Sequence, residues 1–147
     1  MADVKFSDFA SGGATVSGDI VVGLRAGVNT QFTTAASGGG LLWSTIAGTT
    51  QAAAAGNGYI VGNASQTTIT LPASFAIGDT IVIKGFGAAG WVLTANTGDI
   101  IRIGSSVTSA GGTVTSAGVY DVIRVSGLVA NTTWSAEYCL TAGFTIA

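Results

Sequence analysis

The sequence predicts an all-β protein whose main domain is an antiparallel β-sandwich of the jelly-roll type. From residue 59 onward, short segments rich in β-branched residues recur about every 8–12 residues with turn signals between them, which is typical of a sandwich or barrel. Glycine accounts for 23 of 147 residues, and it punctuates every apolar run. Nowhere do ten or more residues follow the 3.6-residue period of an amphipathic helix.

Residues 1–34 are predicted to form a small N-terminal module. Two strands, at residues 20–24 and 28–33, joined by a tight glycine-containing turn would make a β-hairpin. Two strands alone are marginally stable in water. The hairpin is therefore expected either to attach the protein to another protein or to close its own domain.

Residues 35–58 are predicted to be a Gly/Ala-rich linker and an entry strand centred on Trp43, and residues 59–147 to be the C-terminal β-sandwich domain. The pairs Gly78-Asp79 and Gly98-Asp99 precede apolar runs, so these aspartates are expected to accept local backbone N–H groups. The strands of the domain are predicted at residues 67–71, 80–84, 90–95, 100–103, 119–125, 132–140 and 143–146.

Charged residues make up only 8% of the chain, against about 25% in an ordinary globular domain. The net charge is −2, which does not indicate a basic surface for phosphates, so nucleic-acid binding is not expected. No run reaches the ~18 apolar residues of a spanning helix, so membrane insertion is not expected either. A surface with so few charges favours self-association, so an oligomer is predicted. Arg102 and Arg124 could pair with carboxylates at its seam.

Catalytic and cofactor motifs are scarce. Residues 85–90 match G-x-G-x-x-G, but a dinucleotide site needs a helix after the glycines and a strand is predicted there instead, so the match is interpreted as a turn. The chain has no histidine, which removes Ser-His-Asp catalysis and the commonest zinc ligand. A carboxylate pair could hydrolyse a glycan, but most acids look like turn residues. We therefore predict no enzyme activity, no cofactor and no metal.

The aromatic residues offer two interpretations. Trp91, Tyr120 and Trp134 are either core or interface anchors, or a platform on which sugar rings stack. The N-x-S/T sequences at Asn63 and Asn131 are interpreted as chance, because the N-terminus does not resemble a secretory signal. Synthesis in a cytoplasm is expected.

Two parts of the sequence resemble tailed-bacteriophage virion proteins. The segment VKFSDFASGG…GDIVVGLRAGVNTQF resembles the leader at the start of many such proteins, tail fibres especially. The segments ITLPA (residues 69–73), Gly90-Trp91 and NTTW (residues 131–134) are similar to the C-terminal β-domains of phage fibre and adhesin-like proteins. The candidate virion-attachment residues in the leader are Phe6, Phe9, Arg25, Asn29 and Phe32.

The resemblance implies a non-enzymatic virion structural protein, made in the host cytoplasm and assembled as a homotrimer. Its leader would bind other virion proteins and its β-domain would face outward, where such fibres commonly bind a host surface glycan. The chain departs from the pattern in having no long shaft. A short tail fibre or receptor-binding-type component is therefore the first hypothesis. A capsid decoration or head fibre protein and a carbohydrate-binding module are the alternatives.

Overall fold

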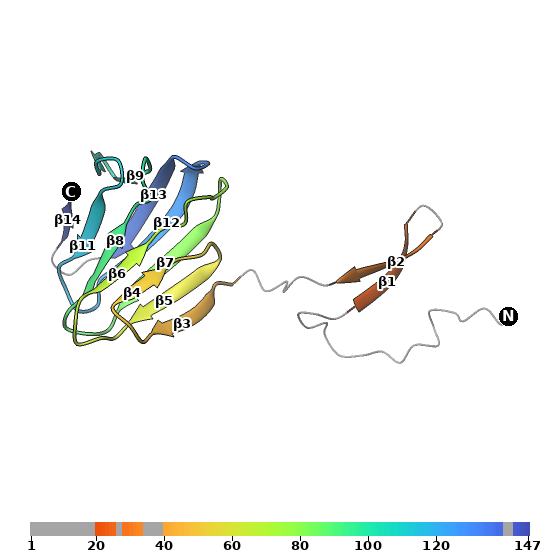
Figure 1. The fold of residues 1–147 in the computed structure, drawn as a ribbon, viewed down its shortest axis with the longest axis horizontal. Helices are drawn as coiled ribbons and strands as arrows, with labels where there is room; N and C mark the ends of the chain where they lie inside the picture. Colours follow the sequence, from red (N-terminus) through yellow and green to blue (C-terminus); the bar gives the residue numbers. More distant parts are fainter. Residues whose placement is uncertain (1–19, 26–27, 34–39, 140–142) are drawn as a thin grey trace. The chain divides into compact units, whose positions relative to one another are not determined.

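The computed structural model describes residues 20–25, 28–33, 40–139 and 143–147 (Figure 1). The chain divides into two compact units, Met1–Gly39 and Gly40–Ala147. In the first unit, β1 (Ile20–Arg25) pairs antiparallel with β2 (Val28–Thr33). The predicted N-terminal pair of strands is therefore confirmed.

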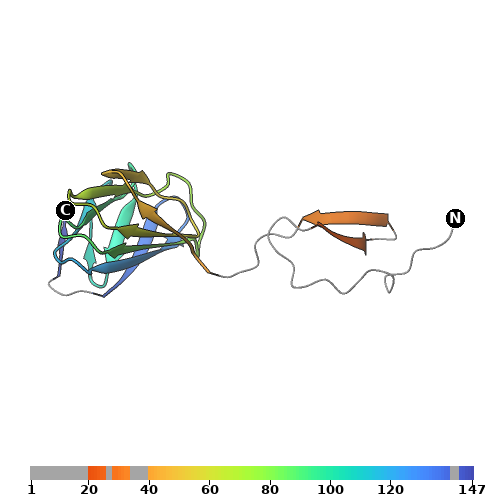
Figure 2. The same cartoon turned by 90° about the horizontal axis from the view of Figure 1, so that it is seen from below.

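The second unit contains two β-sheets, and Figure 2 shows its strands in two layers. The described residues contain no helix, so the prediction of an all-β sandwich is confirmed. The seven-stranded sheet has the order β10 (Ser106–Val107), β9 (Ile100–Ile103), β13 (Thr133–Cys139), β12 (Val122–Val129), β7 (Thr80–Gly85), β5 (Asn57–Val61), β3 (Leu42–Ile46). The five-stranded sheet has the order β14 (Phe144–Ile146), β11 (Thr113–Ser116), β8 (Trp91–Thr94), β6 (Thr67–Thr70), β4 (Thr50–Ala52).

Both sheets are mixed rather than purely antiparallel. From β3 to β8, consecutive strands belong to alternate sheets. Each strand therefore runs parallel to the previous strand of its own sheet. Leu42 of β3 consequently lies opposite Asn57 of β5, and Asn57 lies opposite Ile81 of β7, all in parallel register. β4, β6 and β8 are parallel in the same way. The later strands add antiparallel pairs such as β12 with β13.

The core lies between the two sheets. Strand residues alternate, so that in β6 Thr67 and Ile69 are buried while Thr70 is exposed. The interior is filled by side chains with no solvent exposure, which include Trp91, Trp134, Ile81, Ile83, Leu93, Ile101, Ile123 and Val125. Full burial of one such aliphatic side chain stabilises the fold by about 1.5–3 kcal/mol. This alternation also decides which residues form the two outer faces.

The outer face of the seven-stranded sheet carries charges. Strand register places Lys84 opposite Val122 and Ile60, and Arg124 opposite Val82 and Glu137. Arg102 lies opposite Ser135. Every lysine and arginine of the second unit is therefore on this face, accompanied by one carboxylate.

The outer face of the five-stranded sheet, here called the threonine face, carries no charge. One row of residues in register across it consists of Thr50, Thr68, Val92, Thr115 and Thr145. The next row consists of Ala52, Thr70, Thr94 and Thr113. Threonine is β-branched and suits the pleated surface of a strand, so this composition is locally consistent with the sheet.

Candidate ligand-contacting loop end

The structure separates the three aromatic residues proposed as glycan or interface contacts. Trp91 and Trp134 are completely buried within one chain, whereas Tyr120 is 65% exposed. A ring without exposed surface cannot stack on a sugar or on a neighbouring subunit. The surface interpretation is therefore wrong for the two tryptophans, which are core anchors.

Each buried tryptophan has a defined environment. The Trp91 Nε1–H donates to the main-chain oxygen of Asp121 at 3.2 Å, and its ring lies 5.4 Å from that of Phe144, centroid to centroid. Trp134 stacks on Phe75 at a centroid distance of 4.0 Å, but its Nε1–H has no hydrogen-bond partner. Their size and apolar rings explain why both fill the space between the sheets.

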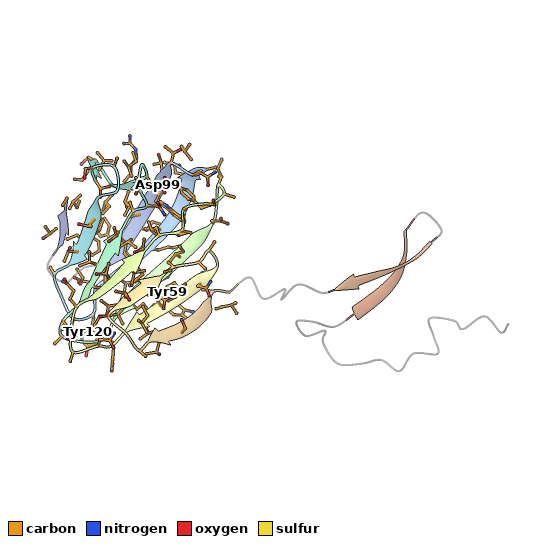
Figure 3. The ribbon with its side chains drawn as sticks, in the orientation of Figure 1. Tyr59, Asp99 and Tyr120 are labelled. Atoms are coloured by element: carbon orange, nitrogen blue, oxygen red, sulfur yellow. The ribbon has the colours of Figure 1, made fainter. Side chains whose placement is uncertain are left out.

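Tyr120 belongs to an exposed aromatic pair with Phe86, here called the aromatic pair. The Phe86 ring is 66% exposed, and the two ring centroids are 6.4 Å apart in an edge-on arrangement. Phe86 follows β7 and Tyr120 precedes β12. Figure 3 shows Tyr120 at one end of the sandwich. Aromatic rings on a solvent-exposed loop end are available to contact a ligand.

Asp121 ties the two loops of the aromatic pair together. Its Oδ2 accepts the N–H groups of Ala117 at 2.8 Å and Gly118 at 2.6 Å, which fixes the turn that carries Tyr120. Its main-chain oxygen accepts the N–H of Gly85 at 2.9 Å, the residue before Phe86. The loop end is therefore held in place by buried polar contacts rather than by its exposed rings.

The glycines of residues 85–90 allow these loops to approach closely. A Cβ at Gly85 would lie 2.5 Å from the Val119 oxygen, and one at Gly87 would lie 2.6 Å from the Asn63 oxygen. Residues 85–90 lead from β7 directly into β8, and no helix follows them. The G-x-G-x-x-G match is thus a connection between the sheets whose glycines permit backbone contact, and it lacks the helix N-terminus of a phosphate site.

The segment of residues 62–66 approaches the aromatic pair at Gly62, where a Cβ would lie 3.5 Å from the Phe86 ring. Asn63 is engaged within the protein, because its amide donates to the Gly48 oxygen at 2.5 Å and to Thr67 Oγ1 at 2.9 Å. Ser65 and Gln66 are exposed.

Two of the described aspartates, Asp79 and Asp99, have different surroundings. Asp79 Oδ2 accepts the Ala76 N–H at 2.8 Å, as predicted for a Gly-Asp turn. Asp99 is buried, its Oδ2 has no hydrogen-bond partner, and desolvation raises the pKa of this carboxyl. It lies at the opposite end of the sandwich from Tyr120 (Figure 3). Within the described part of the chain, no three His, Cys, Asp or Glu residues are grouped to hold a metal ion.

The five candidate virion-attachment residues belong to the first unit. Phe6 and Phe9 lie outside the described residues. Arg25 ends β1, opposite Val28, while Asn29 and Phe32 are in β2. No helix in the described ranges is long and apolar enough to cross a membrane.

Phe86 is the residue of the loop end that the sequence interpretation missed. It sits inside the glycine motif that was interpreted as a turn, and it was not among the candidate contact residues. An aromatic residue flanked by glycines in a turn has no strand face to bury it, and this signal could have identified it. A scan against protein-family models found no match, and a comparison with curated proteins found none either.

Proposed function

We propose that the protein is a non-enzymatic structural component of a tailed-bacteriophage virion, a short trimeric tail fibre or receptor-binding-type protein. The observation that carries this proposal is the loop end, where buried contacts of Asp121 hold Phe86 and Tyr120 exposed on an all-β domain. The separate first unit, Met1–Gly39, would attach to other virion proteins. The second unit would then face outward, toward a host surface glycan.

The threonine face supports the trimer in this proposal. It combines methyl groups and hydroxyls without a charged residue, so identical copies could meet there without electrostatic repulsion. A charge-free surface of this size also promotes association in solution. In the proposed trimer the threonine faces are the subunit seams, and the charged faces remain accessible.

The decisive test is the position of the protein on assembled particles. Phage particles carrying a tagged copy are imaged and compared with particles made with a variant lacking residues 1–34. We expect the tag at the tail, and its loss from particles with the truncated variant, whose second unit still folds by circular dichroism. A tag on the capsid would favour the decoration-protein alternative. Absence of the full-length protein from particles would refute a virion role.

A carbohydrate-binding module is the second candidate, because Phe86 and Tyr120 form an exposed aromatic pair. Glycan-array binding should weaken on Tyr120→Ala or Phe86→Ala by about 1 kcal/mol each, roughly fivefold in Kd. Tyr138→Ala is the control, since Tyr138 is a half-exposed tyrosine on β13, outside the aromatic pair. Equal losses in all three variants would exclude a specific platform at the loop end.

A further inference from the structure

The three cations of the second unit form a diagonal line across the outer face of the seven-stranded sheet, here called the cationic stripe. Arg124 and Lys84 are on adjacent strands and diagonal to one another, because Lys84 lies opposite Val122. Such neighbours are separated by about 7–8 Å. Arg102 lies on the other side of Arg124 with β13 between them, opposite Ser135. With strands about 4.8 Å apart and an offset of two residues, that step is about 12 Å.

The stripe is exposed and poorly neutralised. Arg102, Arg124 and Lys84 are all solvent-exposed, and within the part of the chain that the structure describes none of them forms an ion pair. Of the acids in this unit, Asp79 and Asp121 accept backbone N–H groups in turns, and Asp99 is buried. Glu137, opposite Arg124, is the single carboxylate on the face.

Lys84 is positioned by an aromatic contact. Its Nζ lies 4.6 Å from the centroid of the Trp43 ring, which is within cation–π range. Trp43 reaches Lys84 because Gly58 lies between their strands, where a Cβ would come within 2.6 Å of the indole. The end of the stripe therefore has a fixed cation beside a half-exposed ring.

We propose that the cationic stripe binds an acidic polysaccharide, a glycan whose carboxylates recur along an extended chain. The inference deepens the proposed function and depends on it for the origin of the ligand, a host surface glycan. The cations do not converge, so a single small anion cannot bridge them, whereas a polymer with repeated charges can contact all three.

A row of hydroxyl groups that runs across this face from Arg102 suits a sugar chain. Thr80, Ser126 and Ser135 lie in one row of the face, and the hydroxyls of Thr80 and Ser126 are 3.3 Å apart. These hydroxyls can donate to or accept from sugar hydroxyls. A nucleic acid fits less well, because three cations on a chain of net charge −2 match few of its closely spaced phosphates.

Binding of the full-length protein to immobilised polygalacturonate tests the proposal, with neutral dextran as the reference polymer. We expect binding to polygalacturonate alone, tight at about 0.01 M salt and weaker at about 0.1 M, where the Debye length falls from about 30 to about 10 Å. Arg102→Gln, Arg124→Gln and Lys84→Gln should each weaken binding roughly two- to fivefold. The triple variant should lose at least about tenfold in affinity, if the sites act independently.

Two further variants make the test specific to this face. Glu137→Gln removes the one carboxylate beside the stripe and should tighten binding about twofold. Lys5→Gln removes one positive charge from the other unit and should leave binding unchanged. Because Glu137→Gln predicts a gain, it remains informative even if the triple variant does not fold.

Several results would overturn the proposal. These are no binding to polygalacturonate at low salt, wild-type binding by the folded triple variant, or tighter binding to a single-stranded DNA of equal charge, which would identify a nucleic-acid site. The proposed function is tested separately. If the protein is found on virions but does not bind polygalacturonate, only the proposed role of the cationic stripe is refuted. A protein that binds polygalacturonate but is absent from virions refutes only the virion role.

Discussion

The two outer faces of the sandwich share one construction and differ in charge. In both sheets, the side chains that face the other sheet are mostly aliphatic or aromatic, so the two inner faces are alike in composition. The outward positions are threonine, valine and alanine on the five-stranded sheet. On the seven-stranded sheet they include three cations and Glu137. Outward residues therefore determine what each face can contact, which is why we propose an identical neutral face as the partner of one and an acidic polysaccharide as the partner of the other.

The largest expected effect comes from placing a charge on the threonine face. Thr94→Lys puts an ammonium group in the middle of this face, opposite Thr70 and Thr113. If the face is the subunit seam, an unpaired buried charge costs about 3–5 kcal/mol, and the trimer should dissociate. Light scattering coupled to size-exclusion chromatography should report a monomer at micromolar concentration.

Thr45→Lys is the matched control for that substitution. Thr45 is an exposed threonine on β3, on the outer face of the seven-stranded sheet opposite Ile60. The same added charge should leave the oligomeric state unchanged there. If Thr45→Lys dissociates the protein and Thr94→Lys does not, the roles of the two faces are reversed. If the wild-type protein is itself a monomer, the threonine face is not a subunit interface.

A smaller effect is expected from disturbing the charged face at Gly58. Gly58→Ala places a Cβ 2.6 Å from the Trp43 indole, so the ring must move away from Lys84 and lose its cation–π contact. The expected loss is about 1 kcal/mol of stability, measured by urea unfolding, with the oligomeric state unchanged. Gly48→Ala is the control, because its Cβ would meet only the Thr50 oxygen at 3.9 Å and its stability should not fall.

The sequence predicted the elements whose alternation is regular and missed those without it. The strand predicted at residues 100–103 coincides with β9, and those at 67–71 and 80–84 differ from β6 and β7 by one residue. β4 lies in the segment that was predicted to be a Gly/Ala-rich linker with one entry strand, and β11 lies where no strand was predicted. These short strands are β because they pair with β6 and β8, and pairing partners are not visible in a local pattern.

The sites show the same limit. Tyr120, Trp91 and Trp134 were all candidates from the sequence. Whether a side chain is buried depends on how the two sheets pack, so the sequence could not show that only Tyr120 is exposed. Arg102 and Arg124 were expected to pair with carboxylates at a seam. They share a face because β13 lies parallel to β9 and antiparallel to β12. This mixed connectivity was not predicted, since strands that alternate between sheets leave no distinct periodicity in the sequence.

The smallest expected effect concerns Asp99, a charge that belongs to neither outer face. Its backbone is fixed, because its N–H donates to the Asn96 oxygen at 2.9 Å and its own oxygen accepts the Gly111 N–H at 2.8 Å. Desolvation raises the pKa of its carboxyl above the ordinary 3.8. The protonated form is therefore favoured in the folded state. The stability that the protonated Asp99 carboxyl contributes is fully present below pH 3.8. It is lost as the pH rises through the pKa of the folded state.

The amide in Asp99→Asn is neutral at every pH, so this variant should not lose stability as the pH rises. We expect a higher Tm than wild type at pH 7, with the difference shrinking as the pH falls toward 3.8 and below. Asp79→Asn is the contrasting variant. It replaces the carboxylate that accepts the Ala76 N–H with a neutral amide, which weakens this hydrogen bond and should lower the Tm at pH 7. A lower Tm for Asp99→Asn at pH 7, or a difference independent of pH, would mean that the buried carboxylate gains more from unlocated partners than it loses by desolvation.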